Sequence, residues 1–137
     1  MGSNGSPRKI LVADDDPKLR QMFRELLGRK GYTVVLAEDG AQACESAAKE
    51  LPDLILLDVL MPRCDGYSAL LRLRSQESTR AIPVVFVSGE PPQEHTDIAK
   101  SLGAQGFLPK PFTLASLVST IESVFNGAAS SKGKVDA

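Results

Sequence analysis

Five polar side chains of this sequence stand directly after short apolar runs, where each run would leave a buried core. They are two neighbouring acids, a third acid, a hydroxyl and a lysine: Asp14, Asp15, Asp58, Ser88 and Lys110. Three carboxylates held close together repel one another, and their hard oxygen atoms suit Mg²⁺ with water completing the octahedron. A lysine supplies a mobile positive charge for a phosphoryl oxygen, and a serine supplies a hydroxyl donor. The set therefore contains what phosphoryl transfer requires: an oxygen nucleophile, a divalent ion and donors for the equatorial oxygens.

Asp58 has the clearest local context. The run Leu54–Leu57 before it is unbroken and apolar, which is typical of a strand buried on both faces of a parallel sheet. An unpaired charge is costly inside such a strand, so Asp58 is expected at the carboxyl end. Met61-Pro62 and Asp65-Gly66 then indicate a loop, because proline disfavours helix at the preceding residue and glycine permits a turn. Ligands of open parallel sheets bind outside the carboxyl ends of the strands, so Asp58 is predicted at such a site.

Strand and helix patterns alternate five times along the chain. Apolar runs predict strands at 9–13, 33–37, 54–57, 82–87 and 106–109. Apolar residues at helical spacing predict helices at 17–30, 41–50, 66–75, 93–102 and 114–125. The expected fold class is therefore α/β: a single doubly wound (βα)5 domain with a five-stranded parallel sheet and helices on both faces. Its natural strand order, 2-1-3-4-5, makes the first and third strands neighbours and brings the polar strand ends to one rim.

Helix ends and inward faces follow from local chemistry. Asp16 is expected to cap the first helix, with Pro17 at its first position. Thr113 is expected to cap the last helix, which Asn126-Gly127 should stop. The second helix is expected to turn four residues toward the core: Ala43, Ala47, Ala48 and Leu51.

The length, composition and net charge of the chain limit which classes of function it can have. With 137 residues, 42% of them hydrophobic and 24% charged, the chain suits one globular domain at 9–127, with a flexible lead at 1–8 and a flexible tail or linker start at 128–137. A net charge of −1 disfavours direct nucleic-acid binding. Cys44 and Cys64 are expected to be reduced thiols, and a cytoplasmic location is expected because no apolar run would span a bilayer or serve as a signal peptide. A single histidine, His95, offers little to zinc sites or Ser-His-Asp triads.

Together, these motifs resemble the receiver domain of two-component response regulators (the CheY-like superfamily) over about 9–127. The strand order is well known from this family. The matching segments, in chain order, are Leu11-Val12-Ala13-Asp14-Asp15, Asp58-Val59-Leu60-Met61-Pro62, Asp65-Gly66, Ser88 and Lys110-Pro111.

The resemblance implies a metal-assisted phosphoacceptor. Asp58 would accept a phosphoryl group from the phosphohistidine of a histidine kinase. Asp15 and Asp58 would bind Mg²⁺, or Mn²⁺ in its place, together with the backbone carbonyl of Leu60. Asp14 would act on the metal through water, and Lys110 would pair with the phosphoryl group.

The resemblance also implies a switch. Ser88 would hydrogen-bond the phosphoryl group and Phe107 would turn inward in response, shifting the output face formed by the fourth helix, the fifth strand and the fifth helix. Lys110-Pro111 is a candidate cis peptide bond. Leu60 and Glu90 occupy positions that tune hydrolysis of the aspartyl phosphate in the family, and apolar Leu60 is expected to lengthen the phosphorylated lifetime.

Three departures from the family pattern concern the same region. Serine stands at 88, where threonine is commoner, and Pro109 directly precedes Lys110. Pro91-Pro92 is expected to shorten or displace the fourth helix.

The expected partners are a sensor histidine kinase or a histidine phosphotransfer protein and a downstream effector, with a phosphorylation-dependent homodimer as a further assembly. No nucleic acid, membrane or enzymatic turnover is expected. The alternatives are a receiver-like scaffold that does not need phosphate and an Mg²⁺-dependent phosphohydrolase of the haloacid dehalogenase type. The phosphohydrolase family has a second aspartate two residues after its nucleophile, where this chain has Leu60. A flavodoxin-like cofactor binder is disfavoured because Asp14-Asp15-Asp16 would repel a phosphate in the first loop.

Overall fold

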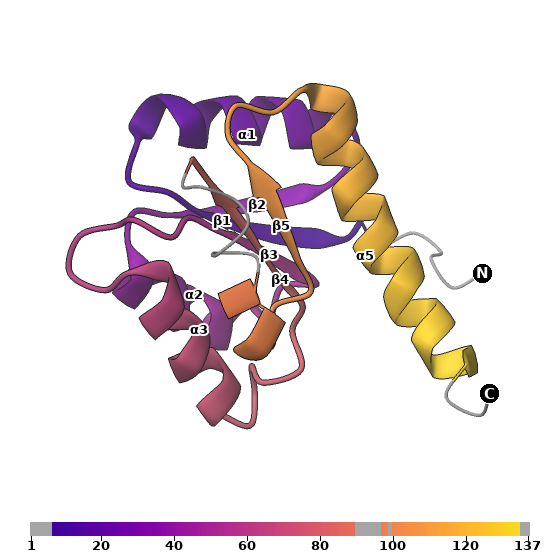
Figure 1. Ribbon diagram of the computed structural model, residues 1–137. Coiled ribbons are helices and arrows are strands. Elements are labelled where there is room, and N and C mark those ends of the chain that lie inside the picture. Colours follow the sequence, from indigo (N-terminus) through magenta and orange to yellow (C-terminus); the bar gives the residue numbers. More distant parts are fainter. Residues whose placement is uncertain (1–6, 90–96, 99, 135–137) are drawn as a thin grey trace.

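The elements alternate between strand and helix in the computed structural model, which describes residues 7–89, 97–98 and 100–134 (Figure 1). In chain order they are β1 (Lys9–Ala13), α1 (Pro17–Arg29), β2 (Thr33–Ala37), α2 (Gly40–Glu50), β3 (Leu54–Leu57), α3 (Gly66–Ser75), β4 (Val84–Ser88), β5 (Gly106–Pro109) and α5 (Leu114–Lys134). All strand pairs are parallel and the sheet order is β2-β1-β3-β4-β5, which confirms the predicted fold class.

Strand register determines where the polar strand ends emerge. Ala13, the last residue of β1, pairs with Ala37 on one side and with Leu57 on the other. Asp14 and Asp58 therefore leave the sheet at the same level on neighbouring strands, and the Asp58 amide donates to the Ala13 carbonyl at 3.0 Å. This adjacency follows from the strand order, because β2 pairs with one side of β1 and the chain then crosses over through α2 to place β3 on the other side.

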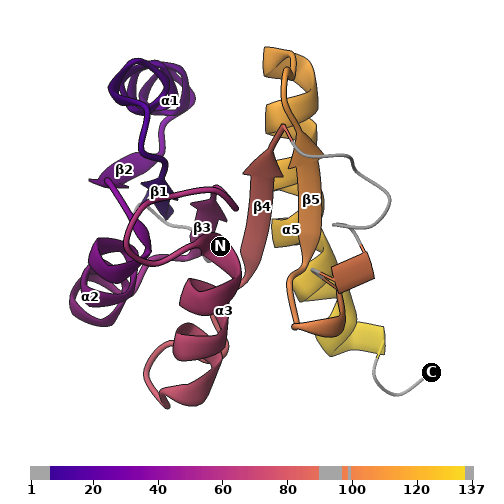
Figure 2. The same cartoon turned by 60° about the vertical axis from the view of Figure 1, so that its left-hand side comes forward.

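Successive side chains of each buried strand enter opposite cores, because side chains in a strand alternate between its faces. Leu11 and Ile55 pack with α2 and α3, whereas Ile10 and Leu54 pack with Phe23 of α1 and with α5. Helices α2 and α3 lie side by side in both ribbon views (Figures 1 and 2). The inner strands β1, β3 and β4 are apolar except at Lys9, which begins β1, and Ser88, which ends β4, because both faces of these strands are covered.

Three aspartates begin the helices that follow the first three strands. Asp16 accepts from the Lys18 amide at the start of α1, and Pro17 stands at the first helical position, as predicted. Asp39 and Asp65 cap α2 and α3 in the same way. An aspartate oxygen satisfies an amide that lacks a partner in the first turn of a helix, so each helix begins at a defined residue next to the polar rim.

Two boundary and burial predictions are wrong. Strand β4 begins at Val84 rather than at residue 82, because Pro83 has no amide hydrogen for the ladder and the Ile82 amide is used in a turn with Thr79. In α2, Ala48 and Leu51 are exposed, and Cys44 takes the inward position. Leu51 adopts a left-handed conformation as the cap of α2, which turns its side chain to solvent.

The last helix is longer than predicted. Helix α5 continues to Lys134, so its predicted end at Asn126-Gly127 is wrong and the helix extends into the range 128–137 that was assigned to a tail. Gly127 is not among the glycines with positive φ, so it does not form the left-handed cap that ends many helices. Alanines at 128 and 129 follow it and favour helix.

The fourth predicted helix, 93–102, falls partly outside the described residues. Positions 97–98 and 100–101 are helical. The features predicted at Glu90, Pro91-Pro92 and His95 lie outside the described residues.

Candidate functional site

Four of the predicted site residues converge at the carboxyl edge of the sheet. The Lys110 Nζ lies 2.9 Å from Asp14 Oδ2 and 3.3 Å from Asp58 Oδ2. One carboxylate oxygen from each of Asp14, Asp15 and Asp58 lies within 4.8 Å of the other two. Asp14 and Asp58 are buried, at 2% and 7% exposure, while Asp15 is exposed and opens the cluster to solvent.

Backbone contacts hold these side chains in place. Asp14 Oδ1 accepts from the Asp16 amide at 2.9 Å, so the start of α1 orients this carboxylate. The Ser88 carbonyl accepts from the Lys110 amide at 2.8 Å, which ties the end of β5 to the end of β4. Gly66 is required where α3 begins, because a β-carbon there would lie 2.3 Å from the Asp58 carbonyl oxygen. The phosphoacceptor candidate thus sits among three fixed elements.

The site holds more negative than positive charge. Burial and the neighbouring Asp14 raise the pKa of Asp58 to about 6, although Lys110 and a hydrogen bond from the Leu60 backbone partly oppose this rise. Burial alone would lower the pKa of Lys110, but its bonds to Asp14 and its contact with Asp58 outweigh that effect and raise it. At neutral pH the Lys110 ammonium is therefore charged and lies beside a mainly ionised Asp58 carboxylate.

The donor set fits a hard divalent cation. The three clustered carboxylates supply oxygen ligands, and a single lysine does not compensate all of their charge. Mg²⁺ prefers carboxylate oxygens and retains several waters, which the exposed side of Asp15 permits.

The remaining predicted residues lie on the same edge or next to it. Ser88 is buried at the end of β4, and Phe107 is half-buried in β5, where it pairs in register with Phe86 and packs against the core beneath α2 and α3. The Leu60 side chain is 59% exposed. The Lys110–Pro111 peptide bond is cis. The roles assigned to these residues stay predictions.

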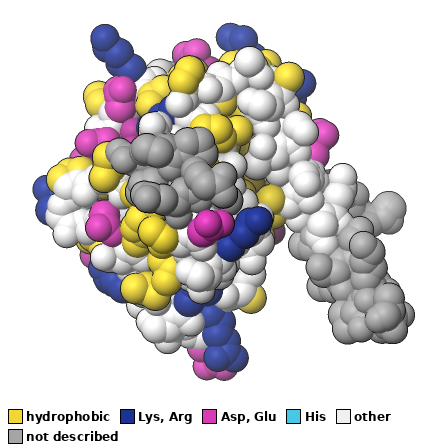
Figure 3. All heavy atoms as spheres, viewed as in Figure 1, with side chains coloured by type: hydrophobic (Ala, Val, Ile, Leu, Met, Phe, Trp, Pro, Cys, Tyr) yellow, Lys and Arg dark blue, Asp and Glu magenta, His cyan; other side chains and the backbone are white. Residues whose placement is uncertain are grey.

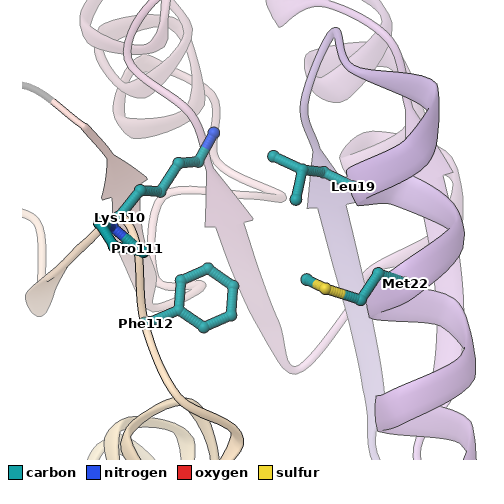
Figure 4. A pocket seen from close by; sticks show the side chains of 5 residues that line it. All are labelled: Leu19, Met22, Lys110, Pro111 and Phe112. Atoms are coloured by element: carbon teal, nitrogen blue, oxygen red, sulfur yellow. The ribbon is translucent and has the colours of Figure 1, made fainter.

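An apolar pocket beside Lys110 was not predicted. It has a volume of about 390 Å³ and is lined by Leu19 and Met22 of α1 and by Lys110, Pro111 and Phe112 after β5. In Figure 4, Leu19 and Met22 project from α1 toward Phe112 and Lys110 across the opening. The sequence contained a partial signal, since Leu19 and Met22 belong to the apolar stripe of α1, but that stripe predicted only core packing.

Sequence reasoning also missed an ion pair between the β3–α3 loop and the start of α2. Asp39 is buried and accepts from Nε of Arg63 at 2.9 Å and from Nη2 of the same side chain. Arg63 follows Asp58 in the loop between β3 and α3, which also contains Leu60.

The distribution of surface charge and the composition of the helices are two further features of the described residues. On the face shown in Figure 3, the side chains of the described residues show acidic and basic groups interspersed rather than one basic patch. None of the helices described by the structure has the length and apolar character needed to cross a bilayer.

A family model and individual known proteins that resemble this chain all point to response regulators. The family model described as "Response regulator receiver domain" matches residues 10–122. Response regulator MprA of Mycobacterium ulcerans is 37% identical over 116 residues, covering 85% of this chain and 49% of that protein. Transcriptional regulatory protein PdtaR of Mycobacterium tuberculosis is 36% identical over 117 residues, covering 85% of this chain and 56% of that protein. The chain thus spans about half the length of these relatives.

Two solved structures share both fold and sequence similarity with this chain. Chemotaxis response regulator CheY4 of Vibrio cholerae matches with a TM-score of 0.82 and 34% identity, over 87% of this chain and 99% of that one. The receiver domain of sensor histidine kinase PA1611 from Pseudomonas aeruginosa matches with a TM-score of 0.78 and 32% identity, over 85% and 96%. That structure is described as having a magnesium ion coordinated in its active site cleft.

Proposed function

This chain belongs to the response regulator receiver domain family of two-component signalling, and from that premise we propose that Asp58 is its phosphoacceptor. A receiver domain is a signalling module rather than a turnover enzyme. The observation that carries the proposal is the position of Asp58: it is a buried carboxylate within 3.3 Å of Lys110 in a cluster of three acids. Asp15 is too exposed for the low-polarity surroundings that favour transfer, and Asp14 is engaged by the start of α1.

The reaction uses Asp58 as an oxygen nucleophile. A carboxylate oxygen attacks phosphorus, the bond from phosphorus to the imidazole nitrogen of the donor breaks, and that nitrogen keeps the electron pair. The product is an acyl phosphate on Asp58. Because the pKa of Asp58 is about 6, most of the group is ionised and reactive at neutral pH. Lys110, already in contact with Asp58, is placed to donate to a phosphoryl oxygen.

Asp15 and Asp58 would hold Mg²⁺, or Mn²⁺ in its place, with the backbone carbonyl of Leu60 and with Asp14 acting through water. The bound ion would compensate negative charge on the carboxylates and on the phosphoryl oxygens. The three clustered carboxylates and the magnesium in the related PA1611 receiver domain support this assignment.

Phosphorylation would then alter the surface that partners recognise. The added phosphoryl oxygens would accept from Ser88 and Lys110, and because Lys110 is bonded through its amide to Ser88, both strand ends would respond together. Phe107 would turn inward and shift the face formed by the fourth helix, β5 and α5. A downstream effector would recognise that face, alone or in a phosphorylation-dependent homodimer.

A protein phosphodonor is the partner that the site accommodates best. Lys110 lines both the acidic cluster and the apolar pocket, so a protein that brings phosphohistidine to Asp58 would cover the pocket as well. We therefore assign the pocket to an apolar side chain of a histidine kinase or histidine phosphotransfer protein. Residues 9–127 form the receiver domain in this proposal, and its location is cytoplasmic together with that donor.

The test is phosphorylation by a small donor. Incubation with acetyl phosphate and Mg²⁺, followed by intact-mass measurement, should add the mass of a single phosphoryl group to the wild type and none to Asp58→Asn. Chelation of the metal with EDTA should abolish the addition. A mass increase that persists in Asp58→Asn, or continuous release of inorganic phosphate far beyond one equivalent without a phosphorylated species, would contradict the proposal.

A further inference from the structure

The loop that carries Leu60 is tied to the start of α2 by a backbone hydrogen bond and an ion pair. The Gly40 amide donates to the Cys64 carbonyl at 3.0 Å, and Arg63 donates to Asp39 through Nε at 2.9 Å and through Nη2. The backbone contact is close, since a β-carbon on Gly40 would lie 2.2 Å from the Cys64 oxygen. The ends of the β3–α3 loop are joined by the Gly66 amide, which donates to the Val59 carbonyl at 2.8 Å, and its middle is held by the start of α2.

Arg63 adopts a backbone conformation that its residue type does not favour. Its φ of 67° is in the left-handed region, where a β-carbon is costly and glycine is the ordinary residue. The arginine therefore needs a compensating interaction, and its guanidinium finds one in Asp39. Burial of that carboxylate, at 3% exposure, is in turn tolerated because Arg63 and the Gln42 amide bind it.

Each partner of this ion pair thus stabilises an unusual feature of the other. The backbone bonds and N-capping by Asp39 would hold α2 without Arg63, but the loop would lose the ion pair that joins it to the residue capping α2. Leu60 lies three residues before Arg63, and its amide already contacts the Asp58 carboxylate. A rotation of the loop about residues 61–63 would reorient the Leu60 carbonyl.

We propose that Arg63 and Asp39 are positioning residues for the metal site: their ion pair holds the β3–α3 loop so that the Leu60 carbonyl faces the divalent ion. The inference rests on the proposed function, in which that carbonyl is a metal ligand. Neither residue contacts the acids of the cluster, so their effect passes through the loop backbone. Loss of the pair should weaken Mg²⁺ binding, while the reaction at saturating Mg²⁺ should keep its rate because Asp58 and Lys110 remain in place.

Three substitutions separate the ion pair from the other roles of these residues. Asp39→Asn removes the charge but keeps a side chain that caps helices equally well. Arg63→Gly removes the guanidinium but favours the left-handed backbone, whereas Arg63→Ala removes the guanidinium and keeps the backbone cost. Glu50→Gln is a matched control because it removes the Lys9–Glu50 ion pair at the opposite edge of the sheet.

The measurements are the Mg²⁺ dissociation constant by titration calorimetry, the acetyl phosphate rate at saturating Mg²⁺, and amide hydrogen exchange at Gly40 in metal-free protein. Asp39→Asn and Arg63→Ala should raise the dissociation constant about tenfold, at the low end for residues that orient metal ligands. Arg63→Gly should have a smaller effect, and Glu50→Gln none. Exchange at Gly40 should become faster in Asp39→Asn and Arg63→Ala.

The outcomes distinguish this inference from the proposed function. Faster exchange at Gly40 with an unchanged Mg²⁺ dissociation constant would overturn the positioning role and leave the phosphoacceptor proposal intact. A wild type that binds no Mg²⁺ would overturn both. If Arg63→Ala does not fold, Asp39→Asn decides the result, since it keeps both the cap and the loop sequence.

Discussion

At the scale of single residues, the site is governed by how one lysine is shared between two buried acids. Lys110 contacts both Asp14 and Asp58, so Asp58 receives only part of the compensation that its burial demands. This explains why the pKa of Asp58 rises to about 6 although a cation lies next to it. The same imbalance prepares the site for a divalent ion, because an added cation removes the repulsion between the acids.

The raised pKa predicts a pH-dependent stability in metal-free protein. The unfolded carboxyl titrates near its ordinary value of 3.8, so between that value and about 6 the folded state holds more protons than the unfolded state. Raising the pH through this window therefore lowers the free energy of unfolding. The free energy of unfolding of Asp58→Asn and of the wild type can be measured in urea between about pH 4 and about pH 8. The amount by which the variant exceeds the wild type should increase up to about pH 6 and then stay constant. A difference in the free energy of unfolding that stays constant across this pH range would contradict the raised pKa of Asp58.

Leu60 provides a prediction for the phosphorylated lifetime. Its side chain is 59% exposed two residues after Asp58, where an apolar group cannot orient water toward the acyl phosphate. Leu60→Asn should therefore hasten dephosphorylation several-fold, as followed by loss of the phosphorylated mass after the donor is removed. Leu60→Met keeps an apolar side chain and should leave the rate near that of the wild type. An unchanged or slower rate in Leu60→Asn would reject this role.

At the scale of elements, the rim is built where strands end and helices begin. Aspartates in the segments between β1, β2 and β3 and the helices that follow them divide their roles between helix capping and the site. Asp16, Asp39 and Asp65 cap, while Asp14, Asp15 and Asp58 form the acidic cluster. Close approach of the helix starts to the strand ends needs residues without a side chain. Gly66 satisfies this need at the start of α3.

Two glycine-to-alanine changes in helices should therefore act in opposite directions. Gly66→Ala would place its β-carbon 2.3 Å from the Asp58 carbonyl oxygen and should lower the free energy of unfolding by at least ~2 kcal/mol. Gly28→Ala in α1 meets no atom within 4 Å and should raise it by ~0.5–1 kcal/mol, because alanine restricts the unfolded chain. Chemical unfolding of both variants checks the pair. An unchanged free energy of unfolding in Gly66→Ala would contradict the prediction, because it would show that the loop after Asp58 can move away from the added β-carbon.

At the scale of the whole molecule, two cores on opposite faces of the sheet support different tasks. The core beneath α2 and α3 supports the loop after β3, and the core beneath α1 and α5 supports the pocket beside Lys110. Phe112 joins the pocket to the second core, where it stacks on Phe23 with a centroid distance of 5.5 Å. The pocket is thus assembled from α1 and from the segment after β5, which lie far apart in the sequence.

A substitution at Met22 should distinguish docking of a protein donor from the phosphoryl transfer reaction itself. This residue lines the pocket on α1 and does not contact the acidic cluster, so Met22→Glu should slow phosphotransfer from a histidine phosphotransfer protein about tenfold, equivalent to ~1.4 kcal/mol. Phosphorylation by acetyl phosphate should be unchanged, because the small donor needs no pocket. Arg24→Gln, at an exposed position of α1, makes the net charge more negative by the same single unit and controls for the change in charge. Equal slowing with both donors would place the effect in the chemistry instead.

The sequence by itself determined the alternation of strands and helices, the helix start at Asp16, and the acids, hydroxyl and lysine at strand ends, because these depend on spacing and on chemistry between near neighbours. Only the tertiary structure decided what depends on distant partners. It paired Arg63 with Asp39, turned Cys44 rather than Ala48 toward the core, and opened a pocket between α1 and Phe112. The physical reason is that burial and ion pairing are set by which surfaces meet across the fold, whereas strand and helix patterns are local.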